Sequence, residues 1–401
     1  MRPAHSFSRM ILLSLMILPL LSVAAVVDDD LGDDVPHVRN GDVPEHGVET
    51  WAPVEAWRAG GEDDEVFFGS IERVLAGPGG EVLAVDLVRN CVQVFGPDGV
   101  YRRALSREGD GPGEVRAPYD LAVLPDGVLA LPLQMVGKVV RLRGDGTPAS
   151  NWSLLENYTS INTVLCRGGN LVMAGQYSLT EGSKHVQHFI LARHFLADGC
   201  RQHIYEEREN VLDFADFTIT ERNFFCARQG ACALGPDGCL YTAADRDAYR
   251  INVYRPDGAL DRVIERAWTP LPRSAEEKAR VRAQLEDDVR NISLPKTFVV
   301  SDTDPVINRL HVDETGNLWV QHARSGLDMP AGVMLRYDVF DARGLFDRQV
   351  SVVCAGDSAE DELQFVDDHH LALLVGAVGG DRAVAGAEDR ALELVVLGDG
   401  G

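Results

Sequence analysis

Residues 77–127 read GPGGEVLAVDLVRNCVQVFGPDGVYRRALSREGDGPGEVRAPYDLAVLPDG, and this stretch decides the fold class. Short runs of apolar and β-branched residues alternate with turns rich in Gly, Pro and Asp, which is typical of antiparallel strands with tight connections. Proline presets φ at the first central position of a turn, and glycine accepts the positive φ that follows. The stretch therefore predicts one β-sheet, a glycine-rich loop and the beginning of a second sheet.

The same unit recurs along the chain, marked most clearly by Pro-Asp-Gly turns at residues 97–99, 125–127, 236–238 and 256–258. Six innermost strands are predicted, beginning near Ile71, Tyr119, Ile161, Ala231, Val306 and Leu363. Radial repetition of such sheets leaves only short, protected edges. The sequence therefore predicts an all-β, six-bladed β-propeller over residues 50–400.

A closed ring requires that the last blade be completed. The apolar run at residues 392–397 falls at the C-terminus and leaves the sixth sheet without an outer strand. Residues 51–59 have a strand-like alternation and precede the first sheet. We expect this N-terminal strand to close the last blade.

Two insertions interrupt the repeats. Residues 206–230 are expected to be a polar and aromatic excursion, and residues 274–292 (SAEEKARVRAQLEDDVRNI) are predicted to form a helix. Ser274 and Glu277 make a capping box at its beginning. Its apolar residues fall on one stripe: Val281, Leu285, Val289 and Ile292. The stripe favours a strut packed on the sheet edges over the alternative, a partner-binding helix.

The N-terminus has the pattern of a signal peptide over residues 1–25. Arg2 and Arg9 precede the run MILLSLMILPLL, and small residues follow it. An uncleaved membrane anchor is the alternative, but the run is short and Pro19 interrupts it. Residues 26–49 are acidic and are expected to be a flexible leader. The mature chain is therefore expected in the periplasm or outside the cell, without a membrane span.

The formal net charge of −24 argues against a nucleic-acid partner, because such a field repels the phosphate backbone. It favours a soluble protein with an acidic surface, and attraction to cationic partners or metal ions is the alternative. The chain contains seven cysteines. Export permits disulfides, and one pair among Cys226, Cys232 and Cys239 is expected. Cys91 and Cys354 lie inside strand patterns and are expected to be buried thiols.

Several runs resemble the bacterial six-bladed β-propeller proteins related to NHL repeats, within the TolB-like propeller superfamily. Residues 107–118 (REGDGPGEVRAP) are similar to that family's GxxGxGPGEFxxP loop, from which Ser106 and Val115 depart. Residues 311–320 (HVDETGNLWV) resemble its DxxGNLWV strand. The resemblance covers about residues 50–400 and implies the fold. It implies no activity, since this fold carries unrelated functions.

The usual binding surface of a propeller is the mouth of its axial channel. The polar candidates for ligand binding at this mouth are Glu72, Arg116, Tyr119, Asp120, Asn162, Asp304 and Asn308. Their carboxylate and amide oxygens could hold Ca²⁺ or another divalent ion, which takes hard oxygen ligands. The alternative is a solvated channel with a polar lining. No catalytic residue is assigned, because no nucleophile with an adjacent base is evident.

The leading hypothesis is an exported, non-catalytic binding module or scaffold. It would present its loops and channel mouth to a protein, peptide or glycan ligand. The alternative is a metal-dependent hydrolase or lyase at the channel mouth, similar to the propeller lactonases or amidating lyases. A purely structural envelope protein is a third hypothesis.

Overall fold

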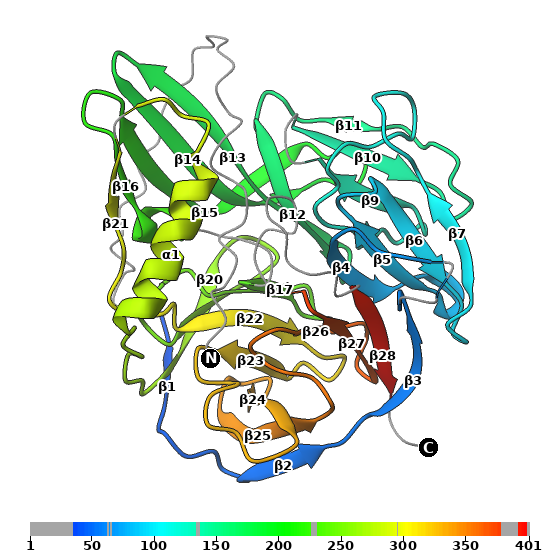
Figure 1. Ribbon diagram of the computed structural model, residues 1–401, viewed down its shortest axis with the longest axis vertical. Helices are drawn as coiled ribbons and strands as arrows, with labels where there is room; N and C mark the ends of the chain where they lie inside the picture. The colour runs from blue at the N-terminus through cyan, green and yellow to red at the C-terminus, as the bar shows by residue number, and fades with distance from the viewer. Residues whose placement is uncertain are drawn as a thin grey trace.

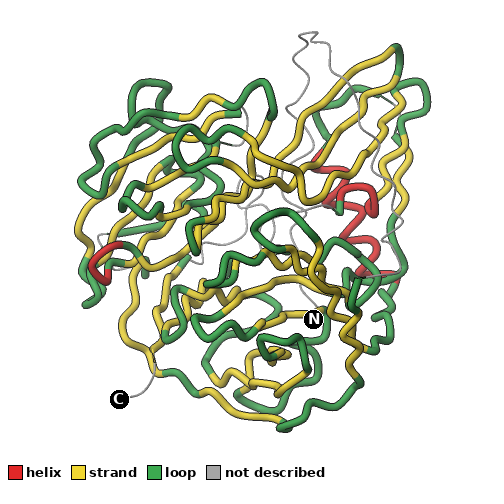
Figure 2. Tube along the Cα trace, turned by 180° about the vertical axis from the view of Figure 1, so that it is seen from behind, coloured by secondary structure: helices red, strands yellow, loops and turns green. Residues whose placement is uncertain are grey.

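The computed structural model describes residues 35–61, 64, 66–133, 137–225, 231–294, 296–377 and 392–398. Its strands form six main sheets in a ring, as Figure 1 shows. Seen from behind in Figure 2, the α-helix lies at the edge of this ring. The predicted all-β, six-bladed architecture is confirmed. The predicted signal peptide and residues 26–34 of the leader lie outside the described residues.

Each blade is an antiparallel sheet, and the first strands of blades 2 and 3, 3 and 4, 4 and 5, and 6 and 1 contact one another. Blade 1 contains β4 (Ile71–Ala76), β5 (Val82–Asp86), β6 (Cys91–Phe95) and β7 (Tyr101–Leu105). Blade 2 contains β8 (Ala122–Val123), β9 (Leu129–Pro132), β10 (Lys138–Leu142) and β11 (Trp152–Ser153). Blade 3 contains β12 (Ser160–Arg167), β13 (Asn170–Glu181), β14 (Lys184–His194) and β15 (Arg201–Asp213).

Blade 4 contains β17 (Cys232–Leu234), β18 (Leu240–Thr242), β19 (Arg250–Tyr254) and β20 (Leu260–Arg266). Blade 5 contains β22 (Ile307–Val312), β23 (Leu318–His322), β24 (Val333–Phe340) and β25 (Phe346–Val353). Blade 6 contains β26 (Glu362–Phe365), β27 (His370–Val375), β28 (Glu393–Gly398) and β3 (Val54–Ala59). All six predicted blade beginnings lie within three residues of the observed inner strands.

The ring closes as predicted, because β3 pairs antiparallel with β28 and places Arg58 opposite Val395. The closing strand is shorter than expected. Trp51 belongs instead to β2 (Val48–Trp51), which runs parallel to β25 of blade 5. In the same way, β1 (His37–Asn40) runs parallel to β20 of blade 4.

The N-terminal segment is therefore a strap across three blades, and residues 37–40 and 48–49 differ from the expected flexible leader. Its first two strands, with the sequences HVRN and VETW, expose most of their side chains. A strand held mainly by backbone hydrogen bonds at a sheet edge shows no apolar alternation in the sequence. That is why residues 37–49 resembled a leader.

The Pro-Asp-Gly turns have the expected backbone. Gly99 has a φ of +76°, which glycine adopts without steric cost. A Cβ at Gly99 would also lie 2.4 Å from Cγ of Trp57, so β3 packs directly on this turn of blade 1. The glycine is therefore required both by the turn and by the closure of the ring.

The glycine-rich loop after β7 is a tight crossover to blade 2, as expected. Glu108 and Val115 form a parallel bridge across its neck. The Glu114 carboxylate accepts a hydrogen bond from the Gly111 amide at 2.9 Å, and the Ser106 hydroxyl donates to the Gly113 carbonyl at 2.7 Å. These contacts satisfy backbone hydrogen-bonding groups of the loop with side chains from the same segment.

The hydrophobic core lies between adjacent blades. Leu83 and Val94 of blade 1 pack against Leu129 and Val140 of blade 2, and each of these side chains is at most 1% exposed. Similar clusters fill the other seams. Because a sheet buries both of its faces in this arrangement, the strands read as nearly continuous apolar runs.

The predicted helix is α1 (Ala275–Asp288), shorter at its C-terminal end than residues 274–292. The expected capping box is present: Ser274 and Glu277 each accept a hydrogen bond from the backbone amide of the other. Leu285 and Val289 are fully buried. The helix is therefore a packed strut, as expected.

The first insertion, at residues 206–230, differs from the prediction. Residues 206–213 are not an irregular excursion but the second half of β15, which has 13 residues. The remainder contains β16 (Thr218–Thr220) and the 3₁₀ helix η2 (Glu221–Phe224), and β16 pairs in parallel with β21 (Thr297–Val299). Charged side chains on one face of β15 obscured its strand pattern.

Two of the three clustered cysteines, Cys232 and Cys239, are free thiols, so they do not form the expected pair with each other. Cys226 lies outside the described residues. Cys91 is buried as expected, whereas Cys354 is only partly buried. Among the described residues, α1 and the other helices are too short or too polar to span a bilayer.

Candidate functional site

Three of the channel candidates occupy equivalent places in alternate blades. The pairing of the inner strand skips Glu72 in blade 1, Asn162 in blade 3 and Asn308 in blade 5. Such a β-bulge locally re-aims a side chain and interrupts the ladder. The structure therefore places these three residues at corresponding bulges near the axis, and ligand binding by them stays a prediction.

Tyr119 and Asp120 lie just before β8, and both are buried. The Asp120 carboxylate accepts hydrogen bonds from the amide of Leu121 at 2.8 Å and from that of Val164 in blade 3 at 2.9 Å. Arg73 of blade 1 lies 3.7 Å from the same carboxylate. Asp120 thus links three neighbouring blades.

Asp304 belongs to a buried ion network rather than to an open mouth. It pairs with Arg273 at 2.6 Å, and Arg273 pairs with Glu221 at 2.8 Å. Arg246 contacts Glu221 on its other side at 2.8 Å. Burial alone would raise the pKa of Glu221, but Arg273 and Arg246 outweigh it, so the pKa lies below its usual value. This network anchors η2 and the segment before α1.

Arg116 lies away from this group, in the crossover loop. Its side chain is 54% exposed, and its guanidinium pairs with Glu108 at 2.5 Å and with Asp110 at 3.1 Å. The seven candidates therefore do not form one cluster. Glu72, Asp120, Asn162 and Asn308 belong to the inner strands or their beginnings, whereas Arg116 and Asp304 belong to loops.

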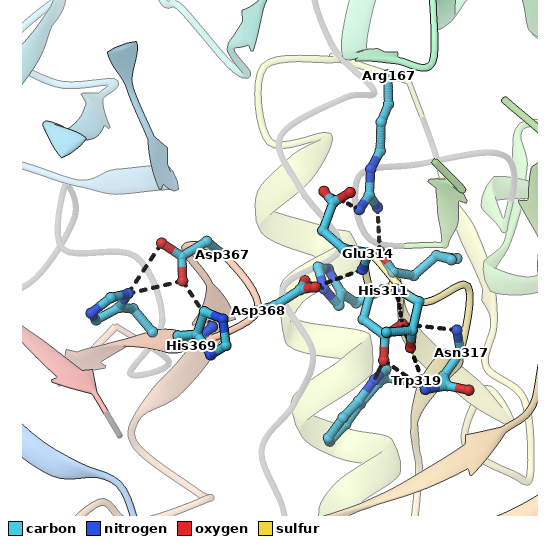
Figure 3. A network of polar contacts seen from close by, with 12 residues as sticks. Arg167, His311, Glu314, Asn317, Trp319, Asp367, Asp368 and His369 are labelled. Carbon is cyan, nitrogen blue, oxygen red and sulfur yellow. Dashed lines mark hydrogen bonds and ion pairs between the residues drawn. The ribbon is translucent and has the colours of Figure 1, made fainter. Parts of the chain in front are cut away.

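Sequence reasoning missed a polar network where the first strand of a blade joins the second, in blades 3, 5 and 6, which Figure 3 shows. Arg167 of blade 3 donates to the carbonyl oxygens of Leu234 in blade 4 and Val312 in blade 5, and pairs with Glu314 at 2.5 Å. The Glu314 amide donates to Asp368 of blade 6 at 2.6 Å. Arg167 thus links blades 3, 4 and 5, and the Glu314 amide continues the network to blade 6.

His311 completes this network. Its ring stacks on Phe365 with the centroids 3.9 Å apart, and its Nε2 lies 3.4 Å from Asp368. Burial lowers the pKa of His311 although Asp368 acts in the opposite direction, so the imidazole is neutral at pH 7. The DETG turn in the sequence indicates this region, but the cross-blade partners are far apart in the chain.

The most distinctive surface lies on blade 3. Its inner strand begins at Ser160, which pairs with Gln176, whereas β13 and β14 continue beyond that point. We call residues 177–188 of this hairpin, with residues 207–213 of β15 beside them, the overhang. Figure 1 shows it extending from the ring, with α1, β16 and β21 beside it.

One face of the overhang is covered. Leu212 and, next to the base of the overhang, Phe189 pack against the insertion and α1, in a cluster that includes Phe217, Ile219, Phe224, Val281, Leu285 and Val289. The Asn210 amide donates to Gln187 on the same face at 2.9 Å, and both side chains are buried. The covered face is therefore part of a small second core.

The opposite face is exposed. Side chains alternate between the faces of a strand, and the register of the three strands assigns this face the following residues: Tyr177, Leu179, Glu181, Lys184, Val186, His188, Glu207, Glu209, Val211 and Asp213. Leu179 is 36% exposed and Val211 is 46% exposed. Three glutamates, one aspartate and one lysine share the face with these apolar side chains.

An ordered polar group stands at the base of the exposed face. The rings of Tyr177 and His188 stack with centroids 4.4 Å apart, and both side chains contact Glu207, at 3.1 Å and 3.0 Å. Burial, followed by the charge of Glu207, raises the pKa of Tyr177 to about 12. The Tyr177 hydroxyl therefore stays protonated and donates to Glu207. The alternation in KHVQHFILARH was the one sequence signal for this face.

No protein-family model and no curated protein matches the chain. Among solved structures, it is similar to a Xanthomonas campestris gluconolactonase (15% identity, 82% of this chain and 87% of that chain, TM-score 0.43). It is also similar to Staphylococcus aureus virginiamycin B lyase (10% identity, 85% of this chain and 98% of that chain, TM-score 0.42). A third similar structure is that of a Bacteroides fragilis protein proposed to be exported (12% identity, 90% of this chain and 99% of that chain, TM-score 0.46).

The chain is a six-bladed β-propeller. The six sheets of the chain itself show this fold. Likenesses at these identities and TM-scores carry no argument about function, so any function of the propeller has to be argued from its own residues. Within the described part of the chain, no three His, Cys, Asp or Glu side chains are grouped so that they could hold a metal ion. A calcium-type ion in this propeller stays a prediction.

Proposed function

We propose that this propeller is an exported, non-catalytic binding module, and that the exposed face of the overhang binds a peptide segment of a partner protein. The observation that carries this proposal is the contrast between the two faces of one sheet. The covered face is packed by α1 and η2, whereas Leu179 and Val211 on the other face stay in contact with solvent. Exposed apolar groups rimmed by polar residues mark interaction sites.

The apolar side chains supply affinity. Fully burying a leucine or valine side chain contributes about 1.5–3 kcal/mol, and Leu179, Val186 and Val211 lie in directly paired positions across the three strands. A rigid sheet presents them without a large ordering cost, since the opposite face is already packed. The overhang is therefore preorganised for an apolar contact.

The charges of the exposed face favour a basic ligand. Glu181, Glu207 and Glu209 outnumber Lys184, and the whole chain carries a formal charge of −24. Complementary charge accelerates encounter and selects among partners. The ligand class that fits is an extended peptide segment in which apolar and basic residues alternate.

Two labelled peptides test this function, one of alternating Val and Lys and one of alternating Val and Glu, with binding measured by fluorescence anisotropy. We expect the Val–Lys peptide to bind at least about tenfold more tightly, because the carboxylates repel the other. The double substitution Leu179→Ser with Val211→Ser should weaken binding by about tenfold or more.

Val100→Ser is the matched control, since Val100 is 50% exposed on blade 1, away from the overhang. It should bind the Val–Lys peptide as the wild type does. Equal affinity for the two peptides, or equal affinity of the double variant and the wild type, would contradict the proposal.

A further inference from the structure

A surface hollow of about 530 Å³ lies on blade 2, far in sequence from the overhang strands. It is bounded by the turn between β8 and β9 and by the connection from β10 to β11. We call it the blade-2 hollow, and its lining residues include Asp126, Gly127, Arg141, Arg143, Gly144 and Ser150. Its volume lies within the range of about 300–1,000 Å³ that small-molecule sites occupy.

Arg141 is held at the hollow by neutral groups. Its guanidinium lies over the Trp152 ring at 4.6 Å, and Nη1 donates to the Ser150 carbonyl at 3.2 Å. The nearest carboxylate, that of Asp126, is 3.9 Å away, which is beyond hydrogen-bond distance. Its buried Nε finds no hydrogen-bond partner among the described residues. The arginine is thus positioned without being neutralised by a bonded carboxylate.

Arg143 lies just past the end of β10, two residues after Arg141, and so projects to the same side of the strand. Its Nη1 donates to the Pro148 carbonyl at 2.8 Å and to the Thr147 hydroxyl at 3.3 Å. Arg103, close by, shows the contrast: it forms a two-point pair with Glu81 at 2.8 and 3.0 Å before it donates to the Gly144 carbonyl. Arg141 and Arg143 therefore retain donors that Arg103 has already used on a carboxylate.

The residues that line the hollow include two guanidinium groups and one carboxylate, although the formal net charge of the chain is −24. A second carboxylate, that of Asp145, stands in the turn after Arg143 and accepts hydrogen bonds from the amide and the hydroxyl of Thr147. Charges farther away than about 8 Å are largely screened at physiological ionic strength, so the local groups dominate for a bound ligand. The planar guanidinium fork matches the oxygens of a carboxylate or sulfate.

The geometry points to the blade-2 hollow as a binding site for an acidic sugar unit, one that carries a carboxylate or a sulfate ester. The two arginines bind the oxyanion. The hollow has room for the sugar ring next to the bound oxyanion. Gly127 and Gly144 carry no side chain, so the ring can approach their backbone closely. This site is independent of the peptide surface on blade 3, because no residue is shared.

Saturation-transfer NMR of the full mature chain tests this site with glucuronate, glucose 6-sulfate, glucose and inorganic sulfate as probes. We expect both acidic sugars to bind and glucose to bind at least about tenfold more weakly, since it lacks the charge-assisted hydrogen bonds. A preference between the two acidic sugars identifies the carboxylate or the sulfate ester as the natural group.

Arg143→Gln should weaken binding of the preferred sugar by about tenfold, and it leaves the fold intact because Arg143 is exposed and bonds only to its own turn. Arg255→Gln is the matched control. Arg255 occupies the corresponding turn of blade 4 but pairs with Asp257 and Asp261. The Arg255→Gln variant should bind the sugar as the wild type does.

Arg141→Gln provides a second variant, checked by its Tm, and should weaken binding at least as much as Arg143→Gln. Equal binding of glucose and the acidic sugars would overturn the inference, as would full affinity in Arg143→Gln. Inorganic sulfate that binds as tightly as glucose 6-sulfate would overturn the sugar part, because the ring would then contribute nothing.

Discussion

The two faces of the overhang belong to the same three strands, yet only one of them has a core of its own. On the covered face, Phe189 and Leu212 are packed by residues of η2 and α1, which come from the two insertions. On the exposed face, the equivalent apolar positions Leu179 and Val211 have no such layer and lie among glutamates. The insertions therefore cover one side of an extended blade and leave the other side exposed to solvent.

The largest effect is expected when the layer that covers one face of the overhang loses its ion network at Glu221. This carboxylate is fully buried between Arg246 and Arg273, and it also accepts the Ser301 amide at 2.8 Å. Glu221→Gln leaves two buried guanidinium groups undercompensated, which should lower the free energy of unfolding by about 3–5 kcal/mol. Chemical denaturation measures it, and Glu286→Gln, at an exposed i,i+4 pair of α1, is the control.

The same carboxylate makes stability depend on pH. Because the pKa of Glu221 is lowered in the fold, its contribution is complete above the unfolded pKa of about 4.3 and is lost as the pH falls through the folded value. The wild type should therefore lose stability in this acid range, and Glu221→Gln should lose less. Parallel acid curves for the two proteins would show that the network is not the origin.

A smaller loss is expected when a cavity is made under α1. Leu285 is fully buried in the cluster that covers the overhang, and Leu285→Ala should lower the free energy of unfolding by about 2–4 kcal/mol. Because the cluster is local, hydrogen exchange should accelerate first in α1 and β14–β15. Uniform acceleration in all six blades would contradict a separate small core.

The beginning of α1 offers a finer test. Ser274→Ala removes the side chain that caps the Glu277 amide, at an expected cost of about 1 kcal/mol. Ser274→Asp keeps an acceptor at that position and should retain most of the stability. A thermal melt in which both variants behave alike would remove the capping box from the explanation.

The smallest effect on stability is expected on the exposed face. Val211→Ser should change the free energy of unfolding by no more than about 0.5 kcal/mol, because nearly half of the side chain already contacts solvent. Its effect should appear in the peptide titration instead. A loss comparable to that of Leu285→Ala would mean that the face is packed rather than exposed.

Much of the fold was accessible from the sequence because the blades repeat one chemical pattern. Apolar runs and Pro-Asp-Gly turns gave the inner strands at Ile71 and Ile161, and the leftover strand near Trp57 gave the closure. The strap strands β1 and β2 were missed, since edge strands held by the backbone carry no apolar alternation.

The surfaces were harder to predict for a physical reason. The channel candidates were chosen for polarity near the axis, but Asp120 and Asp304 use their carboxylates to join segments far apart in the sequence. The exposed face was hidden because charged residues such as Glu207 and Glu209 made half of β15 resemble a loop. Only the pairing of three long strands reveals that those residues stand beside Val211.

The strap imposes an order on assembly. Residues 37–59 are synthesised before any blade, yet each of their three strands rests on a sheet built from residues beyond 230. In their native pairing, β1 cannot dock before β20 exists, β2 cannot dock before β25 exists, and β3 cannot dock before β28 exists. Closure of the ring therefore depends on β28, since β3 pairs antiparallel with that strand.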